Sequence, residues 1–115
     1  MKLLFLLVAV LSSAAVEACE QAKDPSRIAI AGGSITEILY FLGEESRIIA
    51  TDLTSTFPDE AQSFPSVGYV RGLSAEGILS LKPTLVLGEQ DMGPEEVVKQ
   101  LQKTSIDIRK RNLVS

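Results

Sequence analysis

Short apolar runs alternate with helix-like segments along most of this 115-residue chain, and this alternation restricts its fold to few classes. Strands are predicted at residues 27–31, 47–51 and 84–87, and Ile106 and Ile108 indicate the start of a fourth. The runs are short and rich in β-branched residues, which favours strands over helices. Strands separated by helices form βαβ units, whose strands lie side by side in a parallel sheet. The sequence therefore predicts an α/β fold with a short parallel sheet flanked by helices.

The predicted helices have recognisable ends. Ser34 and Glu37 have the spacing of a capping box, and Gly43 supplies the left-handed residue that ends this first helix. Ser74 is predicted to cap a second helix, and Pro94 to be the first residue of a third. The stretch between the second strand and the second helix has no long period of either kind. We expect it to contain at most one or two helical turns.

The N-terminus has the pattern of a secretory signal peptide. Its apolar run, residues 3–11, is much shorter than the roughly 20 residues that a membrane-spanning helix needs. Small residues precede Cys19 at the positions that a signal peptidase recognises, so we predict a signal peptide at 1–18 and a mature chain at 19–115. Lipid attachment at Cys19 is an alternative, although Glu17 stands where a lipobox has a small or apolar residue. An export signal without a pair of cysteines favours the bacterial periplasm.

Composition excludes several classes of function. The chain has no histidine, one cysteine and a net charge of −4, from 11 Lys plus Arg against 15 Asp plus Glu. The acidic balance argues against a nucleic-acid partner held by phosphate neutralisation. A single cysteine cannot form a multi-thiolate metal site, and without histidine the usual catalytic relays cannot be built. We therefore do not expect an enzyme.

Three segments are candidates for a binding site. The turn at 32–34 lies at a helix N-terminus and could cradle an anion, but it has no nucleotide-binding spacing and is interpreted as an ordinary strand-to-helix turn. The acidic turn at 89–91 could bind a cation, with a solvated loop as the default interpretation. In segment 68–72, Tyr69 and Arg71 would face one cleft if the backbone is extended, because alternate side chains of a strand point the same way. Taken alone, they could equally be a half-buried loop aromatic and a surface charge.

Residues 30–38, 68–72 and 73–87 together carry a resemblance to a known family. They are similar to the haemin-binding periplasmic proteins of bacterial haem ABC importers. These form part of a helical-backbone class, class III, of substrate-binding proteins that also serves cobalamin and ferric siderophores. The Leu-Lys-Pro-Thr-Leu-Val stretch at 81–86 is shared across the class, whereas Gly-Tyr-x-Arg followed by Leu-Ser-Ala-Glu-Gly is more particular to the haem branch. The similarity extends from about residue 27 to 108.

The resemblance implies roles for three residues and a transported ligand, haem. Tyr69 matches the axial ligand of ferric haem, and a hard anionic oxygen suits Fe(III). Because a phenol ordinarily has a pKa of about 10, ligation at neutral pH requires the iron and a nearby cation to displace the proton. Arg71 is that cation or the partner of a haem propionate. Glu76 matches an acidic residue that docks against arginines of the membrane permease, although it could also act only on the helix dipole.

The family has two α/β lobes joined by a long helix, with the ligand held between them. By this resemblance, residues 19–115 correspond to part of the N-terminal lobe, and the polar residues 109–112 suggest a chain cut short within it. We therefore expect a monomer that descends from haem importers but binds haem weakly as written. The alternatives are a cobalamin or ferric-siderophore binding protein of the same class, and a fragment without function.

Overall fold

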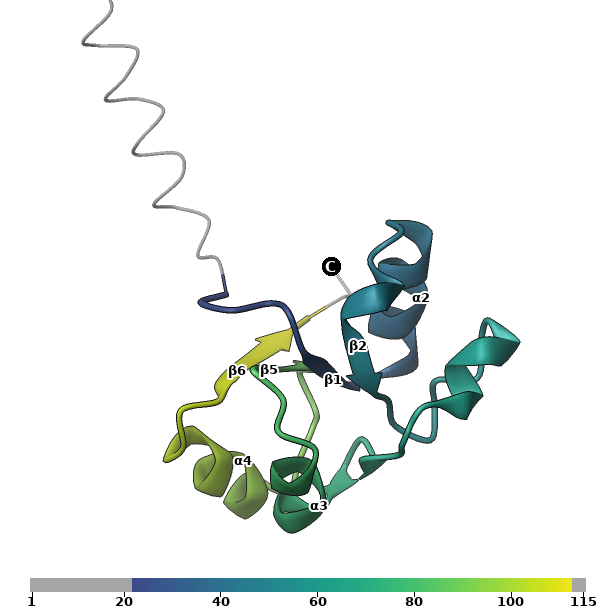
Figure 1. The fold of residues 1–115 in the computed structure, drawn as a ribbon. Coiled ribbons are helices and arrows are strands. Elements are labelled where there is room, and N and C mark those ends of the chain that lie inside the picture. The colour runs from purple at the N-terminus through teal and green to yellow at the C-terminus, as the bar shows by residue number, and fades with distance from the viewer. Residues whose placement is uncertain (1–21, 113–115) are drawn as a thin grey trace, which may run out of the picture.

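The computed structural model describes residues 22–112, and within them four strands form one parallel sheet (Figure 1). The predicted signal peptide and Cys19 lie outside the described residues. The strand order is β2-β1-β5-β6. The strands are β1 (Ile28–Ala31), β2 (Ile48–Ala50), β5 (Leu85–Glu89) and β6 (Asp107–Arg111). The predicted α/β class and all four strand positions are confirmed.

Strand β1 is an interior strand of the sheet, and every one of its residues is buried. It pairs with β2 on one side and with β5 on the other, where Ile28 is opposite Leu85 and Ala31 is opposite Gly88. A strand buried on both faces has a continuous apolar sequence, which is why this run could be identified from the sequence.

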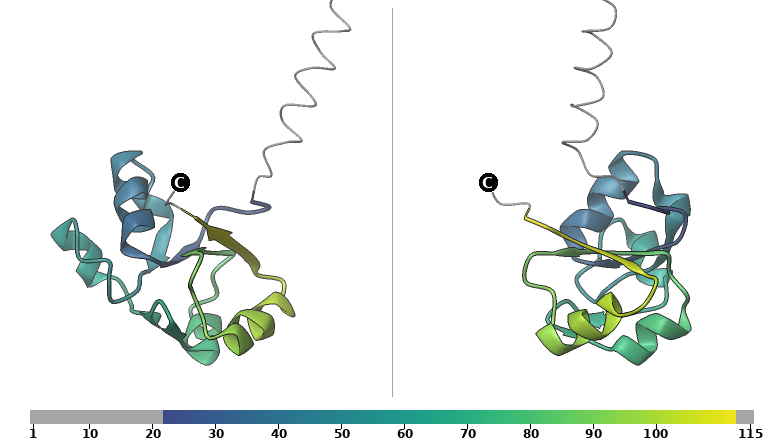
Figure 2. Two further views of the ribbon diagram at one scale, coloured as in Figure 1. Left: turned by 180° about the vertical axis from the view of Figure 1, so that it is seen from behind. Right: turned by 90° about the vertical axis from the view of Figure 1, so that its left-hand side faces the viewer.

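Helices cover both faces of the sheet, as Figure 2 shows. Helix α2 (Gly33–Phe41) packs on one face, whereas α3 (Ala75–Ser80) and α4 (Glu95–Gln102) pack on the other. Successive side chains of β1 point to opposite faces of the sheet. Ile28 and Ile30 pack with Ile35 of α2, and their neighbours Ala29 and Ala31 join the core beneath α3 and α4.

The remaining elements are short. The 3-10 helix η1 (Glu45–Arg47) precedes β2, and η2 (Asp59–Ser63) is the helical turn that was expected between β2 and α3. Two further strands, β3 (Gly68–Tyr69) and β4 (Gly72–Leu73), form an antiparallel hairpin. No helix within residues 22–112 has the length and apolar character needed to cross a membrane.

Two predicted helix starts are wrong, the first by two residues and the second by one. Gly32, with φ of 151°, is the N-cap of α2, so Ser34 lies inside the helix and forms no capping box with Glu37. Side chains distant in the sequence accept the hydrogen bonds of the helix start instead. The Gly32 N–H donates to the Asp52 carboxylate, and the Gly33 N–H donates to the Thr54 hydroxyl. Pro94 is likewise the N-cap of α4 rather than its first residue. The Ser74 cap of α3 is confirmed, since its hydroxyl accepts from the Gly77 N–H at 3.1 Å.

Strand β6 continues through the basic residues 109–111, although buried parallel strands are usually apolar throughout. It lies at the edge of the sheet, next to β5 alone, so full burial is not required of it. Its charges are partly compensated within the strand, where the Arg109 guanidinium donates to the Asp107 carboxylate at 2.9 Å.

Candidate functional site

The β3–β4 hairpin lies at the carboxyl edge of the sheet, held from two sides by backbone hydrogen bonds. The Leu53 N–H, just beyond β2, donates to the Gly68 carbonyl at 2.9 Å. Gly93, beyond β5, donates to the Val70 carbonyl and accepts from the Leu73 N–H, both at 2.9 Å. In open α/β sheets, ligands bind outside the carboxyl ends of the strands. The hairpin is therefore positioned where such a fold presents its site.

Tyr69 and Arg71 meet at the corner of this hairpin. The Arg71 Nη2 and Nε groups donate to the Tyr69 phenolic oxygen at 2.7 and 3.2 Å, and the guanidinium lies 5.5 Å from the centre of the phenol ring. Tyr69 is 41% exposed and Arg71 is exposed as well. The hydrogen bond to Tyr69 is the main cause that raises the pKa of Arg71, with a smaller contribution from Asp91. The arrangement is an exposed oxygen that already has a cation beside it.

The two side chains come together for a different reason from the one predicted. An extended backbone through residues 69–71 was expected, but Tyr69 pairs with Gly72 and the intervening Val70 and Arg71 form the turn. The turn folds the Arg71 side chain back over the Tyr69 ring. The structure brings the two side chains into contact, but the predicted extended backbone is wrong, and that they face one ligand-binding cleft stays a prediction.

A buried carboxylate connects the loop beyond β2 to the start of α2. Asp52, 4% exposed, accepts hydrogen bonds from the Gly32 N–H at 2.9 Å, the Ser55 hydroxyl at 2.8 Å and the Thr54 N–H at 3.1 Å. The Ser55 hydroxyl also lies 2.7 Å from that of Thr36, which is fully buried. Sequence analysis missed this network, since its members are about 20 positions apart. The one local signal was an Asp placed two residues beyond the end of β2.

The turn at 32–34 is occupied by a side chain of the protein itself. A Cβ atom on Gly32 would lie 2.5 Å from the Glu89 Cγ, so the Glu89 side chain packs directly against this turn. Partial burial raises the pKa of the Glu89 carboxyl, as do the nearby charges of Asp91 and Asp52, and a hydrogen bond from the Ser34 hydroxyl opposes them. These contacts agree with the interpretation of an ordinary strand-to-helix turn rather than a cradle for an external anion.

The acidic turn at 89–91 does not form a metal centre in the described part of the chain. Glu89 is the last residue of β5 and only Gln90 and Asp91 are in the turn itself. Among residues 22–112, no group of three or more His, Cys, Asp or Glu side chains is arranged to hold a metal ion.

Glu76 is the second residue of α3 and its side chain is exposed, as its expected docking role requires. It lies in the first turn behind the Ser74 cap, where a carboxylate also stabilises the helix dipole. Both interpretations of Glu76 therefore remain compatible with its position.

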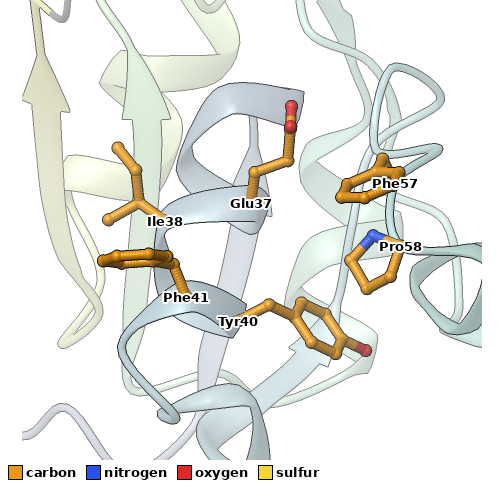
Figure 3. Close-up of a pocket in the computed structure, with 6 residues that line it drawn as sticks. All are labelled: Glu37, Ile38, Tyr40, Phe41, Phe57 and Pro58. Carbon is orange, nitrogen blue, oxygen red and sulfur yellow. The ribbon is translucent and has the colours of Figure 1, made fainter.

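A separate cavity of about 460 Å³ lies along α2, away from the predicted residues (Figure 3). Tyr40 and Glu37 of α2 face Phe57 and Pro58 across it. Phe57 is 65% exposed. Neither Tyr69 nor Arg71 is among its lining residues.

Comparison with known families decides the class of the chain: the periplasmic binding protein model matches residues 28–109. The chain belongs to the periplasmic binding protein family. Its α/β fold, with helices on both faces of a short parallel sheet, corresponds to part of a lobe of a class III periplasmic binding protein.

Solved periplasmic binding proteins share the fold. A periplasmic heme binding protein from Pseudomonas aeruginosa superposes with a TM-score of 0.75 at 40% identity, over 77% of this chain and 32% of that one. The heme-binding protein RhuT from Roseiflexus sp. RS-1 gives 0.71 at 39% identity, over 76% and 34%. The vitamin B12 binding protein BtuF of Vibrio cholerae gives 0.67 at 26% identity, over 74% and 33%.

Among curated sequences, the vitamin B12-binding protein of Pectobacterium carotovorum is 33% identical over 84 residues, which is 73% of this chain and 30% of that protein. This periplasmic binding protein chain therefore spans about a third of the length of the relatives that it matches.

Proposed function

We propose that this chain binds haem in the periplasm and serves a haem ABC importer. The observation that carries the proposal is the exposed Tyr69 phenol at the carboxyl edge of the sheet, with two hydrogen bonds from Arg71. Solved relatives described as heme-binding reach 40% identity, against 26% for the B12-binding structure, which supports haem as the ligand. A periplasmic location is supported by the family and by the predicted signal peptide at 1–18.

In the proposed mechanism, Tyr69 is the axial ligand of ferric haem and Arg71 prepares it. Binding of Fe(III) displaces the phenolic proton, and the resulting phenolate keeps the two guanidinium donors that it already has. The positive charge of Arg71 lowers the cost of the negative oxygen and can also attract a haem propionate. No further base is needed, because the exposed phenol can lose its proton to solvent.

Delivery to the importer is proposed to use Glu76. Its exposed carboxylate on the first turn of α3 is available to a positively charged surface of the permease. We expect Glu76→Gln to retain haem binding and to lose permease-dependent transfer. If Glu76 only stabilises the helix dipole, the substitution would instead lower only the free energy of unfolding, by about 0.3–1 kcal/mol.

Cobalamin binding is the second candidate, because the curated relatives at 30–33% identity are named as vitamin B12-binding proteins. A ferric siderophore is a third ligand of the same class. Neither ligand requires a tyrosinate–iron bond. If either is the true ligand, loss of the Tyr69 hydroxyl should leave its binding affinity unchanged.

The test is an optical titration of the purified protein with ferric haemin and, separately, with cyanocobalamin. We expect haemin to give a high-spin ferric tyrosinate spectrum that Tyr69→Phe abolishes. The matched control is Tyr40→Phe, which removes the other tyrosine of the chain and leaves the spectrum intact. An unchanged haem spectrum in Tyr69→Phe, or tighter binding of cyanocobalamin than of haemin, would overturn the proposal. A thermal melt without a cooperative transition would instead favour a fragment without function.

A further inference from the structure

The outward face of α2 is apolar, although a surface helix usually carries polar residues on this face. Ile35 packs against the sheet and is buried, whereas Ile38 is 43% exposed and Phe41 is 89% exposed. Glu37 is the one charged residue of the helix. Neighbouring apolar side chains that are left in solvent together mark a binding surface.

The cavity of about 460 Å³ along α2 places the Glu37 carboxylate between two apolar walls. In Figure 3, Ile38 and Phe41 lie on one side of the Glu37 side chain. Phe57 and Pro58, from the loop before η2, lie on the other side. The volume is within the range of small-molecule sites, about 300–1,000 Å³. The shape therefore suits a ligand whose polar centre is flanked by apolar groups.

The charges around this cavity are negative. Its lining residues include no Lys or Arg, and within residues 22–112 no ion pair involves the Glu37 carboxylate. Partial burial raises the pKa of the Tyr40 phenol, and the negative charges of Glu60 and Glu45 raise it further. The local field therefore favours a positively charged ligand.

A second copy of this chain is a poorer occupant of the cavity. In a symmetric contact each copy presents the same patch, so two Glu37 carboxylates would approach each other, together with Glu45 and Glu60 near the cavity. Like charges that are brought together across an interface cost free energy. A ligand with a positive charge of its own has no such cost.

We infer that this cavity binds an organic cation whose charge lies at the centre of an apolar body, as in a quaternary ammonium or phosphonium ion. The Glu37 carboxylate attracts the charge, and the side chains of Phe41 and Phe57 contact the apolar groups on either side. An aromatic wall also attracts a cation that approaches the face of a ring. The site is separate from the proposed haem site, because neither Tyr69 nor Arg71 lines the cavity.

The test is isothermal titration calorimetry with tetraphenylphosphonium and with tetraphenylborate, two ions of similar size and apolar surface but opposite charge. We expect the protein to bind tetraphenylphosphonium at least about tenfold more tightly than tetraphenylborate. Glu37→Gln should weaken the binding of the cation by about fivefold, and Phe57→Ala by about tenfold. The matched controls are Glu96→Gln in α4 and Leu79→Ala in α3, which lie outside the cavity and should leave binding unchanged.

Three results would overturn the inference. The first is that neither ion binds, and the second is that tetraphenylborate binds as tightly as tetraphenylphosphonium. The third is that Glu37→Gln and Phe57→Ala, with thermal melts equal to that of the parent, bind the cation with unchanged affinity. Tyr69→Phe should bind the cation as the parent does, and a loss of affinity in this variant would also overturn the inference, because the cation would then use the proposed haem site.

Discussion

The Arg71 guanidinium donates two hydrogen bonds to the Tyr69 oxygen, at 2.7 and 3.2 Å, from the corner of a hairpin whose other side carries Tyr69. Two donors from one planar group fix the direction of the phenol as well as its charge environment. The pair is exposed, so solvent screens its electrostatic energy in the free protein. Its effect should increase when a ligand excludes water from the oxygen.

We predict that Arg71→Gln weakens ferric haemin binding by about ten- to a hundredfold, the range expected for loss of hydrogen bonds to a charged group. Arg71→Lys should recover only part of the loss, since an ammonium keeps the charge but not the two-donor geometry. Optical titration measures both. Arg47→Gln is the control, because Arg47 pairs with Glu44 before β2 and should leave haemin affinity unchanged. Equal affinities for Arg71→Lys and the parent would contradict a role for the planar geometry.

Elements whose residues are buried together could be predicted from the sequence. The β1 run was identifiable because all of its residues are buried, and α3 because its Ser74 cap is local. The capping box at Ser34 failed because α2 takes its partners from Asp52 and Thr54, about 20 positions away. Local pattern cannot reveal a cap supplied by tertiary structure.

The side chains of the candidate site were named from the sequence, but the hairpin and the backbone contacts that hold them were not. Tyr69 and Arg71 were found through a motif, while the two-residue strands of the hairpin are too short for any alternation to show. The anchors of the hairpin are backbone groups of Leu53 and Gly93, and backbone groups leave no trace in residue type.

We predict that Asp52→Asn destabilises the protein by about 2–3 kcal/mol. Asp52 accepts from Gly32, Thr54 and Ser55, and an amide nitrogen in place of one oxygen would face these donors. Buried donors without an acceptor cost about 1–3 kcal/mol each. Urea denaturation monitored by circular dichroism measures the change. Asp59→Asn, on the exposed start of η2, is the control that should stay within about 0.5 kcal/mol. Indistinguishable midpoints for the two variants would argue that the network contributes nothing to stability.

Gly33→Ala is predicted to separate α2 from the loop beyond β2. A Cβ atom at Gly33 would lie 2.4 Å from the Thr54 carbonyl oxygen, a backbone atom that cannot rotate away. We expect a loss of about 2–3 kcal/mol in the free energy of unfolding, within the range of overpacking substitutions. Gly77→Ala in α3 is the comparison, since its Cβ would meet only the Ser74 side chain at 3.3 Å and alanine favours the helix. A cost for Gly33→Ala no larger than that for Gly77→Ala would contradict the close approach.

Glu89→Gln is predicted to stabilise the protein at neutral pH, by about 0.5 kcal/mol or roughly 2–4 °C in melting temperature. Partial burial and the charges of Asp91 and Asp52 raise the folded-state pKa of Glu89 above its ordinary value of 4.5. Between the unfolded and the folded pKa the native state binds more protons, so stability falls as pH rises through this window. Glutamine removes the charge and can still accept from the Ser34 hydroxyl.

Thermal melts of Glu89→Gln and the parent, followed from pH 7 down to pH 4, separate this cause from a simple change in packing. The advantage of the variant should shrink as pH falls through the folded pKa of Glu89, because the parent then becomes neutral at the same position. Glu96→Gln is a comparison in which the melting temperature should change in the opposite direction. Glu96 is exposed in the first turn of α4, where its negative charge interacts favourably with the helix dipole. Loss of this charge should therefore slightly lower the melting temperature at pH 7. A Glu89→Gln advantage that is constant with pH would mean that the charge of Glu89 is not its source.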